Sequence, residues 1–174
     1  MIEQATKPVS REPHLVERPS QTMAVIYTQG EPRSSADRAL PALYSAVYHL
    51  RSVLKREGRA FKIDHLRARW PDAHRVPRER WTAIWGLPIP ADVKEIIARK
   101  AGFSVLREVW DYGLVAEILH VGPYASEGDS VRALHAFIAE QGYETSGPHE
   151  EEYLTARRAR TQQTLIRYPI RPKP

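Results

Sequence analysis

The sequence predicts an α+β fold, in which an antiparallel sheet carries helices on one face. Short β-branched and aromatic segments outnumber the helical ones, which is typical of this class. Residues 25–32 and 118–123 are both apolar strands that run into glycine and proline and are followed by an amphipathic helix. This repeat predicts two pseudo-equivalent strand-helix-strand-strand modules with a ligand cleft between them.

The domain is expected to span residues 22–172, with its halves at about 22–88 and 103–172. Residues 1–21 contain three prolines and no apolar period, so we expect a flexible N-terminal arm there. The chain has no cysteine, which excludes a disulfide framework and a thiol nucleophile. The rest of the 174 residues are enough for a single domain with its own core.

The first module begins with a strand at 22–28, which is β-branched and aromatic. A helix should begin near Ala36 and end near Gly58, because leucine and valine recur at spacings of three and four between them. Strands at 61–66 and 81–87 then complete the module, with a turn-rich segment between them.

The second half follows a short connecting helix that has Pro90 in its first turn. Asp111, Tyr112 and Gly113 separate two strand-like runs and predict a hairpin. The elements expected in this part are helices at 90–100 and 130–141, hairpin strands at 103–110 and 114–121, and strands at 150–154 and 164–170.

The net charge of +5 is concentrated at one end of the chain. Residues 155–174 hold 6 of the 26 basic residues and no acid, so the preceding residues carry 20 basic and 21 acidic side chains. Proteins that bind nucleic acid spread basic residues over a face or helix, so we expect no direct nucleic-acid partner. With no apolar run near 18 residues and no signal peptide, we also expect no membrane partner and a cytoplasmic location.

Three consecutive glutamates in residues 148–154 form the strongest candidate site. On a strand, Glu151 and Tyr153 share one face, while Glu150 and Glu152 share the other. A partly buried Glu151 could neutralise a cationic ligand or act as a general base, and Tyr153 could donate a hydrogen bond or offer its ring to a cation. The alternative is a solvated row of acids with Tyr153 in the core.

Two further groups could line a binding site. His120 and Tyr124 lie where a strand ends, a position from which ligand-contacting side chains often project. The alternative for His120 is a histidine whose hydrogen bonds are satisfied within a tight turn. Large aromatic side chains could line an apolar pocket or simply fill the core. The candidates of this kind are Trp70, Trp85, Trp110 and Tyr44.

Cofactor and metal motifs are missing. The sequence has no glycine-rich phosphate loop, no Gly-x-Ser-x-Gly elbow and no His-Glu-x-x-His. The seven histidines show no metal-ligand spacing, and His149 with Glu151 lacks a visible third ligand. We therefore predict no cofactor and no metal.

The order and spacing of several motifs over residues 114–170 resemble those of the GyrI-like small-molecule-binding domain, and most closely its stand-alone branch. The residues that carry this resemblance are His120-Val121-Gly122-Pro123-Tyr124, Phe137-Ile138-Ala139-Glu140-Gln141-Gly142-Tyr143, His149-Glu150-Glu151-Glu152-Tyr153-Leu154, and Thr164-Leu165-Ile166-Arg167-Tyr168-Pro169-Ile170. The resemblance implies a cleft between two modules that takes lipophilic, often cationic compounds. It also implies that Glu151 points into this cleft with Tyr153 beside it.

The resemblance implies three kinds of function. The first is binding of a lipophilic, aromatic or cationic drug or natural product, for sequestration or resistance. The second is hydrolysis of strained, cyclopropane-bearing DNA-alkylating natural products, with Glu151 and Tyr153 as catalytic residues. The third is an interaction module for a protein partner such as gyrase or a transcription regulator. This sequence departs from the stand-alone branch at two positions. Arg67 stands where the branch usually has an acid, and Glu150 stands where it has a histidine. The arginine at position 67 counts against hydrolysis more than against binding.

Overall fold

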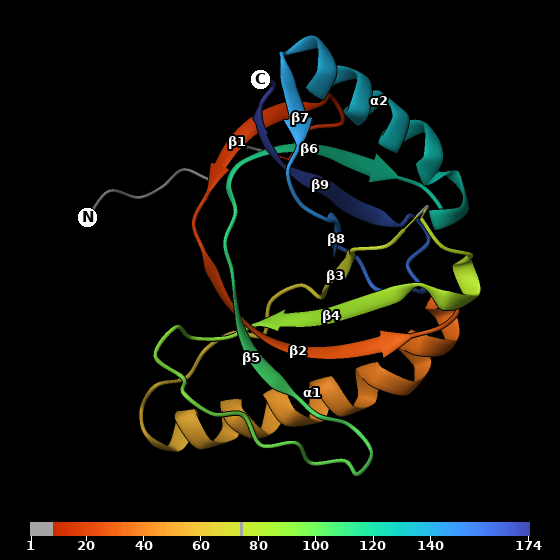
Figure 1. The fold of residues 1–174 in the computed structure, drawn as a ribbon. Helices are drawn as coiled ribbons and strands as arrows, with labels where there is room; N and C mark the ends of the chain where they lie inside the picture. The colour runs from red at the N-terminus through yellow and green to blue at the C-terminus, as the bar shows by residue number, and fades with distance from the viewer. Residues whose placement is uncertain (1–8, 74) are drawn as a thin grey trace.

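The computed structural model describes residues 9–73 and 75–174 and confirms the predicted α+β class. A curled antiparallel sheet has two α-helices on its outer side (Figure 1). Its strand order is β1-β6-β9-β8-β3-β4-β2-β5, and β7 pairs with β9. The strands are β1 (His14–Arg18), β2 (Gln21–Gln29), β3 (Arg67–Trp70), β4 (Thr82–Pro88), β5 (Leu106–Trp110), β6 (Gly113–Val121), β7 (Tyr143–Thr145), β8 (His149–Tyr153) and β9 (Gln163–Pro172). The helices are α1 (Pro32–Arg56) and α2 (Glu127–Glu140), with short 3-10 turns η1 (Arg78–Arg80) and η2 (Tyr124–Ser126).

The two predicted modules are present as β2-α1-β3-β4 and β6-α2-β8-β9. Each helix packs on strands of its own module, and the modules meet where β3 pairs antiparallel with β8. In that register Ala68 lies opposite Glu151. The sequence segment with three glutamates therefore runs along the centre of the sheet.

Local sequence explains why α1 forms where it does. Glu31 accepts a hydrogen bond from the backbone N–H of Ser34 at 3.0 Å, and Pro32 occupies the first turn. Lys55 and Arg56 in the last turn complement the negative end of the helix dipole. Alanines alternate with Leu43 and Val47 along the buried face, which lets the helix approach the sheet closely.

The sheet separates two apolar regions. The outer face is covered by one cluster of buried side chains under α1 and another under α2. The inner face carries a smaller cluster that includes Met23, Val25 and Trp110. Gly86 lies against that cluster, because a Cβ there would stand 2.9 Å from Met23 Cε and from the Trp110 ring.

The predicted helix at 90–100 is wrong. Only one turn forms, where the Val93 N–H donates to the Pro90 carbonyl at 3.2 Å. The Arg107 side chain donates to the carbonyls of Val93 (2.7 Å) and Ala91 (3.3 Å), which would accept intrahelical hydrogen bonds in a longer helix. The predicted strand at 61–66 is also displaced, since the pairing begins only at Arg67.

The predicted hairpin is wrong as well, although both of its strands exist. β5 pairs with β2, whereas β6 pairs with β1 and β9. The strand before each module therefore pairs with the other module. β1 precedes the first module and pairs with β6 of the second, and β5 precedes the second module and pairs with β2 of the first. Part of the predicted N-terminal arm is therefore a strand, β1, while residues 1–8 lie outside the described part of the chain.

Candidate functional site

The strand β8 places its side chains alternately on the two faces of the sheet, as the sequence predicts. Glu151 lies opposite Ala68 on β3 and Ile166 on β9, which belong to the apolar clusters under α1 and α2. Tyr153 shares this helix-covered face, and the Glu151 side chain is only 12% exposed there. The face predicted to carry the site is therefore turned toward the helices.

Glu151 ends a chain of short hydrogen bonds. Its Oε2 accepts from the Tyr153 hydroxyl at 2.6 Å, and its Oε1 lies 2.9 Å from His149 Nε2. The other ring nitrogen of His149 lies 2.7 Å from the Tyr168 hydroxyl. His149 therefore links Tyr168 to Glu151 through its two ring nitrogens.

A second carboxyl reaches the same place from the start of α2. Burial, and then the charge of Glu151, raises the pKa of Glu127 to about 9. Glu127 is thus a carboxylic acid at neutral pH, and its Oε1 is buried without a hydrogen-bond partner among the described residues. Burial alone would raise the pKa of Glu151, but the hydrogen bond and the charge of His149, followed by the hydrogen bond from Tyr153, outweigh it and lower that pKa. The pair therefore holds one proton and one negative charge.

Aromatic rings surround this pair. Tyr124 from η2 meets the Tyr153 ring edge-on, with centroids 5.7 Å apart. Tyr153 also packs against the cluster under α1 that contains Trp70 and Trp85, whose centroids lie 5.3 Å apart. Tyr44 of α1 packs against the same cluster. Five of the predicted ligand-lining residues therefore lie on the face that carries Glu151.

Two of the predicted residues have other roles. His120 is buried, and its ring nitrogens lie 2.9 Å from Ser130 Oγ and 3.1 Å from the Pro123 carbonyl oxygen. It holds the turn against α2, which matches the alternative of a satisfied histidine. Trp110 is on the opposite, inner face, where the Arg69 guanidinium stacks over its ring at 4.0 Å.

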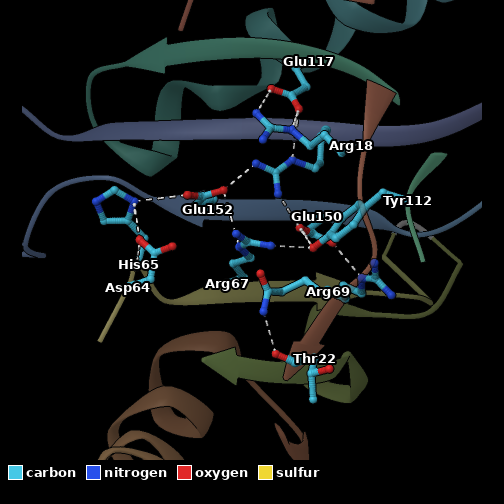
Figure 2. Close-up of polar contacts among 12 residues, drawn as sticks. Arg18, Thr22, Asp64, His65, Arg67, Arg69, Tyr112, Glu117, Glu150 and Glu152 are labelled. Atoms are coloured by element: carbon cyan, nitrogen blue, oxygen red, sulfur yellow. Dashed lines mark hydrogen bonds and ion pairs between the residues drawn. The ribbon is translucent and has the colours of Figure 1, made fainter. Parts of the chain in front are cut away.

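The inner face carries a buried ionic network (Figure 2). Glu150 and Glu152 are 1% and 7% exposed, so the alternative of a solvated row of acids is wrong. Arg167 pairs with both of them, and Arg69 donates to Glu150 at 2.7 Å. The remaining members are Arg18, Arg67, Tyr112 and Glu117.

Arg67 belongs to this inner network and not to the outer face. It lies opposite Glu152 in the β3–β8 register, and its guanidinium donates to the Tyr112 hydroxyl at 2.9 Å. The arginine that replaces an acid at position 67 therefore places no cation beside Glu151. It balances the buried charge of Glu152 instead.

A cluster of side chains with metal-ligand chemistry lies at the rim of the network. Asp64, His65 and Glu152 bring ligand atoms within 4.8 Å of one another. Arg167 and Arg67 already compensate the charge of Glu152, so we assign no metal there. Among the described residues, no helix combines the length and the hydrophobicity needed to span a lipid bilayer.

Two surface hollows lie away from Glu151. One, of about 370 Å³, is bordered by the end of β2 and by residues 102–106. The other, of about 520 Å³, lies between Tyr48, Arg51 and residues 60–63. Glu151 borders neither hollow, and its side chain is only 12% exposed.

Sequence reasoning missed Glu127 and Tyr168 as members of this group. It paired His149 with Glu151 only as possible metal ligands, because the two lie two residues apart on the same strand face. Glu127 was visible only as an acid at the start of a helix. Tyr168 comes from a different strand and is brought to His149 by the pairing of β8 with β9.

No family model matches the sequence, and a search of curated proteins finds no match. Solved structures do match. An uncharacterized conserved protein from Listeria innocua has a TM-score of 0.81, with 20% identity over 94% of both chains. A hydrolase from Listeria innocua has a TM-score of 0.76, with 19% identity over 94% of this chain and 93% of that one. The EcmrR C-terminal domain has a TM-score of 0.70, with 13% identity over 93% and 98% of the chains. At these identities the likeness shows a shared fold, and that fold is consistent with a GyrI-like domain.

Proposed function

We propose that the protein is a GyrI-like domain that binds a lipophilic, aromatic cation at Glu151 and so sequesters it. One contrast carries this proposal. The buried acids of the inner face are each paired with arginine, whereas Glu151 has no arginine or lysine partner among the described residues. Its ion-pair partner is the imidazole of His149 at 2.9 Å, and because buried charges are normally paired, a cationic ligand would add the permanent positive charge that the acids of the inner face already have.

The surroundings of Glu151 suit an aromatic cation. The rings of Tyr153 and Tyr124 offer π faces, which attract a cation most strongly where water is excluded. Tyr124 is partly exposed on η2, at the rim of the site. A natural product or drug with a delocalised positive charge fits these requirements.

Calorimetric titration with tetraphenylphosphonium, and with neutral triphenylphosphine oxide for comparison, tests the proposal. Replacing Glu151 by Gln removes the charge but keeps the side-chain shape. We expect the cation to bind about 1–3 kcal/mol more weakly and the neutral compound to bind equally well. Glu144→Gln, at an exposed acid that pairs with Arg171, is the matched control. Equal affinity of the cation for the Glu151→Gln variant and the parent protein would sink the proposal.

A second candidate is hydrolysis of a strained ring, and the carboxyl pair favours it. Glu151 is a carboxylate that could take a proton from water, while Glu127 is a carboxylic acid that could give one to the leaving atom. The net reaction adds one water across the broken carbon–carbon bond of a cyclopropane. Mass spectrometry after incubation with a cyclopropane-bearing alkylator should then show a ring-opened product. Binding without any such product would leave sequestration alone.

A further inference from the structure

The strand β2 runs on beyond its neighbour β5 and leaves an open edge. β5 begins at Leu106, which lies opposite Val25, whereas β2 continues to Gln29. Residues 26–29 therefore pair with β4 on one side and with no strand on the side of β5. At about 3.3 Å per residue, this open edge is about 13 Å long.

The hydrogen bonds of the ladder show which backbone groups of β2 face the open edge. The Gly30 N–H, directly after β2, donates to the Trp81 carbonyl at 3.0 Å, on the side of β4. Because the direction alternates along an antiparallel strand, even-numbered residues of β2 face β4 and odd-numbered residues face β5. The N–H and C=O groups of Tyr27 and Gln29 thus face the open side, where the described residues offer them no backbone partner.

The open edge borders the surface hollow of about 370 Å³. The side chains of Tyr27 and Leu106 are 49% and 48% exposed, and both line this hollow together with Phe103. Arg38 of α1 lines it as well. Backbone donors and acceptors, apolar side chains and one guanidinium therefore meet in a single hollow.

Arg38 marks one end of the open edge, and its charge is available. A Cβ on Gly30 would stand 3.8 Å from Arg38 Nη2, so the guanidinium lies just past the last residue of β2. Its only printed contact among the described residues is a hydrogen bond from Nε to a carbonyl of its own helix. The acids of the neighbouring turn and strand have other partners. Glu31 caps α1, and Glu108 accepts from the Tyr27 hydroxyl at 2.5 Å.

We propose that this hollow is a second binding site, which takes the C-terminal end of a partner polypeptide as a short added strand. The backbone of the peptide pairs with Tyr27 and Gln29, and an apolar side chain packs on Leu106 and Phe103. The peptide runs parallel to β2, because its terminal carboxylate then reaches Arg38, and a guanidinium binds a carboxylate in a bidentate way. The open edge ends at this arginine, so a chain that also ends there fits it. This site does not depend on the proposed binding of a cation.

Selection of peptides tests the proposal on the full chain. A phage library that displays random sequences with a free C-terminus is panned against the immobilised protein, and the selected peptides are synthesised as acids and as C-terminal amides. We expect an apolar residue near the C-terminus of the selected peptides. Their amides should bind about tenfold more weakly, because the charged hydrogen bonds to Arg38 are lost. Amide hydrogen exchange at Tyr27 and Gln29, followed by NMR, should slow when the acid binds.

Two variants assign the carboxylate contact. Arg38→Gln should weaken binding of the acid about tenfold and leave binding of the amide unchanged. Arg56→Gln, at an exposed arginine in the last turn of the same helix, is the matched control and should change neither. The proposal is overturned by recovery of no peptide family, by equal binding of acid and amide, by an Arg38→Gln variant that binds like the parent, or by unchanged exchange at Tyr27 and Gln29. Competition by tetraphenylphosphonium would also overturn it, because the hollow lies away from Glu151. The proposed function is tested separately, by the direct binding of that cation.

Discussion

Replacing Arg167 with methionine should destabilise the protein strongly. This side chain is fully buried, and its guanidinium faces three carboxylates. Nη1 lies 2.8 Å from Glu150, Nη2 donates to Glu152, and Nε lies 3.5 Å from Glu117. Methionine keeps much of the apolar stem but leaves these carboxylates short of one positive charge.

The expected cost follows from that arrangement. Removing one partner of a buried ion pair costs about 3–5 kcal/mol, because the other charge stays buried without compensation. Arg69 still pairs with Glu150, and Arg67 lies 3.5 Å from Glu152, so we expect the lower part of that range. A domain of this length loses about 2–4 °C of melting temperature per kcal/mol, so the midpoint should fall by roughly 10 °C.

Urea unfolding followed by tryptophan fluorescence measures the change, and Arg171→Met is the matched control. Arg171 lies on the same strand, but its side chain is 66% exposed and pairs with Glu144. Loss of such a surface pair should cost below about 1 kcal/mol. The deficit of Arg167→Met should also shrink as the pH falls, because carboxylates without a partner take up protons. A loss no larger than that of Arg171→Met, or one that is the same at all pH values, would refute this account of the network.

Two further predictions concern the inner face. Burial would raise the pKa of Glu152, but the charges of Arg167 and Arg67 outweigh it and lower this pKa from 4.5 to about 2. A shift of that size contributes about 3 kcal/mol to the free energy of unfolding. This contribution is fully present above pH 4.5 and is lost as the pH falls toward 2. Acid titration of the unfolding free energy should show this loss, and Glu152→Gln should flatten that part of the curve. Gly86→Ala should cost about 1–3 kcal/mol in urea unfolding because its Cβ would collide with the buried Trp110 ring. Gly128→Ala is the control, since its Cβ meets only the flexible end of the exposed Arg132 side chain; no difference between the two glycine variants would contradict the packing described for Gly86.

The local sequence was enough to predict the elements that depend on short-range patterns. The apolar spacing of α1 and the alternation along β8 need no distant partner, and both agree with the structure. The same alternation separated Glu151 and Tyr153 from Glu150 and Glu152. It could place side chains on two faces, but it could not tell which face is buried and by what.

Only the tertiary structure decided the rest, because strand partners and buried charges depend on residues far apart in the chain. The local sequence of β5 and β6 predicts a hairpin, yet β5 pairs with β2 of the first module and β6 pairs with β9 of the second. Glu150 and Glu152 read as surface acids until β9 and β3 bring arginines to them. Likewise, the pKa of Glu127 is raised by burial and then by the charge of Glu151, which lies 24 residues away in the sequence, so no local pattern could predict it.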